Sequence, residues 1–307
     1  RRNLNRYPMA ELLLIRFGEM TLKSAPVRKE FERTLRRNIL EQFTLDGLPC
    51  RLRSDYGHLY VEVDSAARGL RLLRRVFGIT SASQVFEVAT DPALIGAELL
   101  RRADDRLTPQ ASFAVRARRT GQHTFTSQEL ARDLGGVVLD RWPERALHVD
   151  LEHPNVELFV EVRGARTYLS FDRTPGPGGI PLGVAGRVVA LVDGRRGALG
   201  AYLMMKRGCR CGLVVVSNVA QLVDDVLRRF DPKVESEPSD SDSATWGAAV
   251  EHMLDRTRAD GVVLPLTVED YPAARVQFGD RVLFSPTVGL TDEEVDQRWQ
   301  EIERAVA

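Results

Sequence analysis

The chain has 307 residues, of which 43% are hydrophobic and 28% charged, a composition that excludes a wholly disordered chain and allows two or three domains. Lys plus Arg and Asp plus Glu number 43 each, so the formal net charge of zero does not by itself indicate a nucleic-acid partner. Three cysteines exclude a disulfide framework, and no apolar run reaches the roughly 20 residues that cross a bilayer, so we expect a cytoplasmic protein without a membrane partner.

The charges are unevenly distributed along the chain. Basic residues crowd the first forty positions, whereas acidic residues collect between positions 224 and 242. Because a local basic face is enough to attract phosphates, a nucleic-acid partner remains open.

The N-terminal half predicts two small α+β units in series. Apolar runs and helical spacing predict the first as β-α-β-α-β, with strands at 11–17, 58–64 and 84–88 and helices at 25–43 and 66–76. The second is predicted to contain helices at 92–101 and 127–141 and strands at 112–118, 147–150, 157–163 and 167–172.

A different pattern follows the Gly- and Pro-rich stretch 175–183, which predicts a connector. Beyond it, apolar strands at 187–192, 211–217, 261–266 and 281–284 alternate with helices at 197–207, 219–230, 246–259 and 293–306. Such alternation indicates an α/β domain with a parallel sheet that is covered on both faces. The polar run 233–245 lacks periodicity and is expected to be a loop.

Two stretches carry residues suited to RNA. Lys23 follows a glycine turn and stands near Arg28 and Lys29, where flexible cations can reach phosphates. The alternative for this loop is an ordinary solvated turn.

The second stretch is the strand that begins at residue 113. Alternation turns its apolar residues to one face and Arg116 and Arg118 to the other, and Arg119 and His123 follow in a Gly-containing turn. Arginine can contact phosphate or stack on an unpaired base, so the strand predicts a platform for RNA. A solvated edge strand, with His123 as a structural surface residue, is the alternative.

Five motifs then occur in order along the chain: RxGEMxLKS at 16–24, VFGI at 76–79, VRARRxGxHxF at 115–125, GxGGIPLG at 176–183 and AYLMMKRGC at 201–209. In this combination the chain resembles the tRNA 4-thiouridine synthetases, also called tRNA sulfurtransferases. The resemblance implies an N-terminal ferredoxin-like domain at 8–88, a THUMP domain at 89–175, a linker at 176–186 and a Rossmann-like PP-loop domain at 187–307. It also implies that the N-terminal modules bind the acceptor end of tRNA, while the last domain adenylates uridine 8 with ATP and receives sulfur from a cysteine persulfide.

Two departures from the family pattern concern that chemistry. The family's SGGxDS loop, whose amides and hydroxyls hold the pyrophosphate of ATP, falls on 192–197, where only Gly194 matches. Asp193 adds a carboxylate, Arg195 and Arg196 replace small or acidic residues, and Gly197 lacks a hydroxyl. In addition, no cysteine follows Cys211, and Cys209 and Cys211 are interpreted as core residues, not metal ligands.

We therefore expect a tRNA-binding protein without catalytic residues or a metal, which positions tRNA for a tRNA-modifying partner enzyme and whose family includes homodimers. The alternative is a divergent tRNA sulfurtransferase that makes 4-thiouridine at position 8, and only then are ATP and magnesium expected as cofactors. A nucleotide-sensing module is a third hypothesis. Residues 1 to about 185 are expected to fold and to bind RNA alone, because few contacts cross a Gly/Pro connector.

Overall fold

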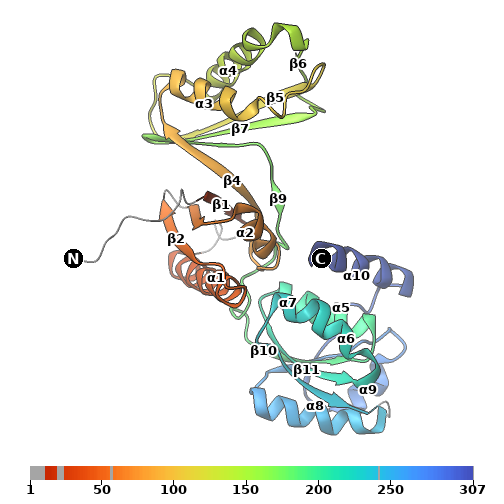
Figure 1. Ribbon diagram of the computed structural model, residues 1–307. Helices are drawn as coiled ribbons and strands as arrows, with labels where there is room; N and C mark the ends of the chain where they lie inside the picture. The colour runs from red at the N-terminus through yellow and green to blue at the C-terminus, as the bar shows by residue number, and fades with distance from the viewer. Residues whose placement is uncertain (1–10, 19–23, 56–57, 241–242, 307) are drawn as a thin grey trace, which may run out of the picture. The chain divides into compact units, whose positions relative to one another are not determined.

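The computed structural model describes residues 11–18, 24–55, 58–240 and 243–306, and these residues form two compact units (Figure 1). The first unit contains the described residues up to Ile15 together with 50–70 and 82–174. The second combines 16–49 and 71–81 with everything from Pro175 onward.

A nine-stranded sheet supplies the framework of the first unit. Its order is β2-β3-β1-β4-β8-β7-β5-β6, with β9 paired to β4. The strands are β1 (Glu11–Phe17), β2 (Cys50–Asp55), β3 (His58–Val63), β4 (Ile79–Ala89), β5 (Ser112–Thr120), β6 (His148–Val149), β7 (Val156–Arg163), β8 (Arg166–Ser170) and β9 (Thr174–Pro175). The sequence interpretation missed β2, which pairs with β3 although its CRLRSD sequence has few apolar residues.

Helices α3 (Pro92–Ala103) and α4 (Ser127–Arg141) cover one face of this sheet, and α2 (Ala66–Leu73) connects β3 to β4. The covered face is apolar because alternate strand residues such as Phe113, Val115 and Val160 meet Leu99 and Leu134 of the helices. The predicted alternation of the strand beginning at residue 113 is therefore confirmed.

The second unit contains a five-stranded sheet in the order β12-β11-β10-β13-β14, and all of its pairs are parallel. Its strands are β10 (Arg187–Val192), β11 (Arg210–Val216), β12 (Glu235–Ser239), β13 (Gly261–Val263) and β14 (Val282–Phe284). Strand β12 shows that the prediction of a loop over 233–245 was wrong. The prediction failed because β12 is an edge strand, and its backbone pairs with β11 without the help of apolar side chains. An edge strand also tolerates a proline such as Pro238.

Helices cover both faces of this sheet, as the sequence predicted. Helix α5 (Arg195–Lys206) and helix α10 (Asp292–Val306) share a core with one face, and α8 (Ser243–Thr257) and α9 (Tyr271–Phe278) cover the other. The helix predicted over 219–230 is divided into a 3-10 turn (Ser217–Val219), α6 (Ala220–Leu222), a π turn (Val223–Leu227) and α7 (Arg228–Phe230), and α9 was not predicted.

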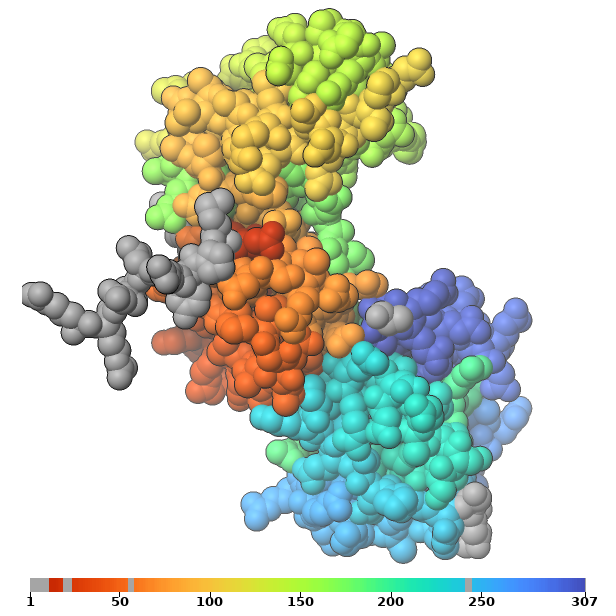
Figure 2. Space-filling model, viewed as in Figure 1, coloured from red at the N-terminus to blue at the C-terminus, as the bar shows by residue number. Residues whose placement is uncertain are grey.

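Helix α1 (Ala25–Leu45) and residues 71–81 pack into the second unit. Figure 2 shows the orange surface of α1 adjoining the cyan surface of the chain near residue 230. The Gln42 side-chain amide donates to the carbonyl of Arg229 at 2.9 Å, and the Phe77 ring stacks on Phe230 with 4.9 Å between centroids. Segments that are distant in sequence therefore share one core.

The connector at 175–183 places its glycines against neighbouring backbone. A Cβ atom on Gly176 would collide with the carbonyl of Ile79, and one on Gly179, whose φ is +75°, with the carbonyl of Lys206. Glycine is thus required where the chain passes close to these two carbonyls. None of the helices in the described part of the chain is long and apolar enough to span a bilayer.

Candidate nucleic-acid interface

Strand β5 presents Arg116 and Arg118 on the side opposite the core. The Arg116 Nε donates to Glu157 at 2.9 Å and its Nη2 donates to the carbonyl of Leu151 at 2.7 Å, so this side chain is held in place. Arg118 and Arg119 are exposed, and Arg119 donates to the carbonyl of Gly121 at 3.0 Å. The predicted face with Arg116 and Arg118 exists, and Arg118 is its exposed cation. Arg119, predicted in a turn, lies within β5 and follows the alternation of Val115 and Ala117 instead.

The same strand is an edge over much of its length. Strand β6 pairs only with Ser112 and Phe113, and from residue 114 onward the described residues place a neighbour, β7, on one side alone. The Phe113 carbonyl faces the β6 side, where it accepts from the Asp150 amide at 3.0 Å. Because strand backbone groups alternate, the N–H and C=O groups of Val115, Ala117 and Arg119 point to this open edge.

A cavity of about 450 Å³ opens beside this edge. It is lined by Val115, Arg116, Ala117, Arg118, Ser127, Gln128, Ala131, Glu157, Phe159, Glu161 and Arg173. Cationic donors, carboxylate acceptors and an aromatic ring in one cavity suit a polar, partly planar ligand such as a nucleotide.

Arg173 and Phe159 are site residues that the sequence interpretation missed. The Arg173 guanidinium lies over the Phe159 ring, 4.1 Å from its centroid, and both side chains line the cavity. Phe159 could have been found from the sequence, because alternation along β7 places it on the same face as Glu157 and Glu161. Arg173 follows β8, and its position beside the cavity depends on the fold alone.

His123 is part of the turn after β5. Its Nε2 lies 2.9 Å from the carbonyl of Gly164, and its ring stacks on Phe125 at 5.5 Å between centroids. Gly121, with φ of +105°, leaves room for this ring. The geometry assigns His123 a structural part in shaping the turn, and a contact with RNA stays a prediction.

The N-terminal cations belong to the second unit. Arg28 and Lys29 are exposed in the first turns of α1, whereas Lys23 lies outside the described residues. Arg116, Arg118, Arg119 and His123 lie in the first unit, so Arg28 and Lys29 belong to a different compact unit from the residues of β5 and its turn.

The predicted nucleotide loop joins β10 to α5. Gly194 is the N-cap of α5 in extended backbone, and the helix begins at Arg195, two residues earlier than predicted. Both arginines consequently stand in the first helical turn. Burial raises the pKa of the Asp193 carboxyl, and the positive charge of Arg196 opposes this shift.

Arg196 is bound to the chain at three acceptors. Its guanidinium donates to the carbonyls of Thr287 and Leu290 at 2.8 and 2.9 Å and to the Asp292 carboxylate at 2.8 Å. Only 14% of its side chain is exposed. Arg195 pairs with Asp296 at 3.1 Å. Both arginines of the loop are therefore paired with carboxylates of the chain itself.

Gly197 is required by packing. A Cβ atom here would collide with the carbonyl of Leu191 and lie 3.0 Å from an Asp193 carboxylate oxygen. Serine, the family residue at this position, therefore needs a different path of the β10–α5 loop.

Cys209 and Cys211 are free and buried in the core shared with α5, which confirms the interpretation of both as core residues. Burial raises the pKa of both thiols. Among the described residues no group of three or more His, Cys, Asp or Glu is placed to hold a metal ion.

Comparisons with known proteins agree with the fold and with these motifs. Residues 12–83 match the ThiI ferredoxin-like domain, and residues 101–172 match the THUMP domain. The chain is 36% identical over 214 residues to a probable tRNA sulfurtransferase of Methanothermobacter thermautotrophicus, covering 68% of this chain and 53% of the relative. It is 33% identical over 231 residues to that of Methanobrevibacter smithii, covering 73% and 58%.

The chain thus spans about half the length of the curated relatives that it matches.

Two solved structures share its fold. PH1313 from Pyrococcus horikoshii superposes with a TM-score of 0.80 at 24% identity, covering 95% of this chain and 99% of that one. A 4-thiouridine synthetase in complex with RNA and ATP gives a TM-score of 0.79 at 22% identity, covering 95% and 85%. The chain thus contains the ThiI ferredoxin-like domain and the THUMP domain, and it is similar in sequence to tRNA sulfurtransferases over about half of their length.

Proposed function

We propose that this chain binds tRNA, that its THUMP domain recognises the acceptor end, and that the chain does not itself adenylate RNA with ATP. The observation that carries the binding proposal is the open edge of β5, where exposed arginines border a nucleotide-sized cavity. Backbone amides and arginines of an edge strand can contact phosphates without reading sequence, while the cavity accepts an unpaired end.

The β10–α5 loop supports the second part of the proposal. A pyrophosphate site needs small residues and several free N–H donors at the start of a helix. Here Asp193 brings a carboxylate to that position, and Arg196 is held by Asp292 and two carbonyls. These residues do not fit a bound polyphosphate.

The names of the curated relatives support the alternative, a sulfurtransferase that makes 4-thiouridine at position 8 of tRNA with ATP and magnesium. In that case Arg196 must leave its three partners when nucleotide binds. A tRNA-modifying enzyme and a second copy of this chain are the protein partners proposed under either function.

Two titrations test the proposal. Intact tRNA is expected to bind with an affinity that falls steeply between low and moderate salt, and tRNA shortened at its acceptor end is expected to bind more weakly. The triple variant Arg116→Ala, Arg118→Ala, Arg119→Ala should lose most of this affinity. Equal affinity of the wild type and the triple variant would refute recognition through β5.

Calorimetry with ATP and magnesium, with and without tRNA, tests the nucleotide part. No saturable binding is expected in either condition. A micromolar dissociation constant, or release of pyrophosphate that depends on tRNA, would favour the sulfurtransferase alternative instead.

A further inference from the structure

Glu161 and Arg163 form a buried ion pair on β7, beside the cavity that opens along β5. Their side chains are only 8% and 9% exposed. The Arg163 Nη2 donates both to the Glu161 carboxylate and, at 2.7 Å, to the Nε2 atom of His58. His58 accepts there, because a guanidinium can only donate. Glu161 lines the cavity and Arg163 does not, so Arg163 contacts the cavity only indirectly, through Glu161.

A second cation stands next to Glu161. Arg118 is its register partner on the adjacent strand β5, and both residues line the cavity. Side chains that are opposite each other on one face of a sheet are close enough to pair. The neighbour of Glu161 on the other side, Tyr168 of β8, brings a ring and no charge. Glu161 therefore stands between Arg163 on its own strand and Arg118 on the next.

The ion pair with Arg163 leaves Arg118 available to a ligand. Arg118 is exposed, and its side chain forms no hydrogen bond or ion pair with any residue that the structure describes. A buried carboxylate without a counter-charge is costly, so Glu161 would turn to the nearest remaining cation if Arg163 were absent. That cation is Arg118, and a phosphate would then have to displace Glu161 from it.

We propose that Arg163 is a positioning residue of the RNA interface: it holds the Glu161 carboxylate away from Arg118, so that Arg118 can contact a phosphate. The inference rests on the proposed tRNA-binding function and concerns how the same cavity is kept cationic. His58, the other partner of Arg163, lies within the ferredoxin-like domain, whereas Glu161 lies within the THUMP domain. A residue of one domain thus helps to hold a carboxylate of the other.

Direct contact of Glu161 with the ligand is a less suitable explanation for this carboxylate. A ribose hydroxyl would have to replace the guanidinium as the donor to a buried carboxylate, and a charged donor forms the stronger hydrogen bond. The variant Glu161→Gln separates the two explanations. It should bind RNA at least as tightly as the wild type if Glu161 is only held aside, and more weakly if Glu161 binds a ribose.

The first test removes the holding charge from the full chain. The probe is a short single-stranded RNA with the acceptor-end sequence, titrated at temperatures where each variant is folded. Arg163→Gln should bind it about fivefold more weakly, and the slope of log affinity against log salt should fall by about one, because one phosphate contact is lost. The double variant Glu161→Gln, Arg163→Gln should recover the affinity and the slope. Arg163→Lys keeps the charge and should retain most of the affinity.

A double-mutant cycle with Arg118→Ala distinguishes positioning from lost stability. In that background Arg163→Gln should have no further effect on affinity, because the cation with which Glu161 would pair is gone. An equal loss in both backgrounds would overturn the inference and leave Arg163 with a purely structural part. Failure of Glu161→Gln to restore binding to Arg163→Gln would overturn it as well.

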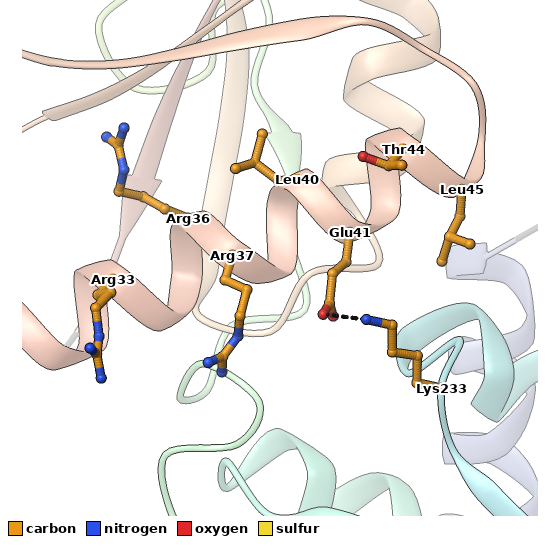
Figure 3. A pocket seen from close by; sticks show the side chains of 8 residues that line it. All are labelled: Arg33, Arg36, Arg37, Leu40, Glu41, Thr44, Leu45 and Lys233. Carbon is orange, nitrogen blue, oxygen red and sulfur yellow. Dashed lines mark hydrogen bonds and ion pairs between the residues drawn. The ribbon is translucent and has the colours of Figure 1, made fainter.

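A carboxylate among arginines in the second unit supplies the matched control. Glu41 lines a groove on α1 together with Arg33, Arg36 and Arg37, and it pairs with Lys233 at 2.8 Å (Figure 3). Lys233→Gln takes one cation from Glu41, as Arg163→Gln does from Glu161, but in the unit that does not contain β5. It should leave the affinity for the single strand unchanged. A loss equal to that of Arg163→Gln would indicate a general effect of charge and contradict the inference.

A measurement on the unaltered protein does not depend on the folding of any variant. In NMR spectra of the arginine side chains, the guanidinium protons of Arg163 should exchange slowly with water and those of Arg118 rapidly, since only Arg163 is buried and paired. Addition of the RNA should shift the signals of Arg118 and leave those of Arg163 in place. Slow exchange at Arg118 without RNA would show that Glu161 is not held away from it.

The outcomes separate this inference from the proposed function. If the wild type binds the RNA and the cycle shows no coupling between Arg163 and Arg118, the inference fails and the proposed function stands. If the wild type binds neither tRNA nor the single strand, the proposed function fails and this inference fails with it.

Discussion

Arg196 is the residue that most clearly distinguishes the β10–α5 loop from a nucleotide-binding loop. All three of its recorded partners are acceptors of the chain itself, and they lie between β14 and the start of α10. The residue therefore ties the β10–α5 loop to a segment about ninety positions later in the sequence. Lysine cannot reproduce this arrangement, because it lacks the planar fork of donors.

We predict that Arg196→Ala lowers the free energy of unfolding by about 2 kcal/mol, because it leaves two carbonyls without their donor. Chemical denaturation of the variant and of Arg196→Lys, which should be intermediate, measures the loss. A variant as stable as the wild type that also gains ATP binding would show that the arginine blocks a functional site instead.

Asp193 allows a pH prediction at the same loop. Burial raises the pKa of this carboxyl above its ordinary value, so the folded state favours the protonated form. Its contribution to stability is therefore present at acidic pH and is lost as the pH rises through the folded-state pKa. Asp193→Asn should be at least as stable as the wild type at neutral pH and should show less gain on mild acidification. Denaturant titrations of both proteins across that pH range measure the difference, and parallel curves would contradict it.

Residue patterns predicted which way side chains point but not what holds them. Alternation correctly placed Phe113 and Val115 in the core and Arg116 on the opposite face. The partners of Arg116, the carboxylate of Glu157 and the carbonyl of Leu151, come from segments that only the fold brings near. How available an arginine is to a ligand depends on these partners. The sequence does not show them, so it could not predict that Arg116 is less available than Arg118.

Helices and strands could be predicted from the sequence where apolar residues recur at regular spacing or where capping residues mark a helix end. Helix α4 has the range predicted, and its start carries a capping box in which Thr126 accepts from the Glu129 amide at 3.1 Å and Glu129 accepts from the Thr126 amide at 2.7 Å. Strands β2 and β12 were missed because charged or polar residues dominate them and pairing alone makes them strands. Their partners, not their own composition, decide their conformation.

The capping box gives a prediction for this element. Thr126→Ala should lower the free energy of unfolding by about 1 kcal/mol, because an N-cap hydroxyl satisfies an amide that the helix leaves open. Since α4 covers the arginine-bearing strand β5, the loss should also appear as faster amide exchange in the first turn of α4. Thr126→Ser, which keeps the hydroxyl, is the matched control, and an equal loss in both variants would mean that packing and not capping is responsible.

At the scale of the whole molecule, local patterns do not reveal which segments share a core. The sequence indicated domains separated at a Gly/Pro connector. In the structure α1 and residues 71–81 belong to the same compact unit as the residues after that connector. The aromatic contacts of Phe77 with Tyr202 and Phe230 span more than 120 positions, and no periodicity in the sequence reports them.

This arrangement changes what is expected of a fragment that ends near residue 185. Such a fragment keeps Asn38 and its acceptor, the carbonyl of Leu182, but it removes Tyr202 and Phe230 from Phe77 and the carbonyl of Arg229 from Gln42. Phe77 is 1% exposed in the intact chain, and exposing a buried phenylalanine costs about 1.5–3 kcal/mol. We therefore predict that fragment 1–185 melts at a lower temperature than the full chain and binds a hydrophobic dye.

The fragment should bind RNA at temperatures where it is folded and lose binding when it unfolds. The reason is that β5, α4 and the cavity beside them lie wholly within the first unit. The full-length variant Phe77→Ala separates the two effects: it loses the aromatic contacts of Phe77 but keeps the whole chain after residue 185. It should melt below the wild type and above the fragment, with the affinity for single-stranded acceptor-end RNA unchanged at temperatures where it is folded. Differential scanning calorimetry and RNA titration of the three proteins provide the comparison. A fragment that melts with the same midpoint as the full chain would show that the contacts of α1 and Phe77 with the residues after 185 contribute little to the stability of the N-terminal part, and that the connector is a true domain boundary.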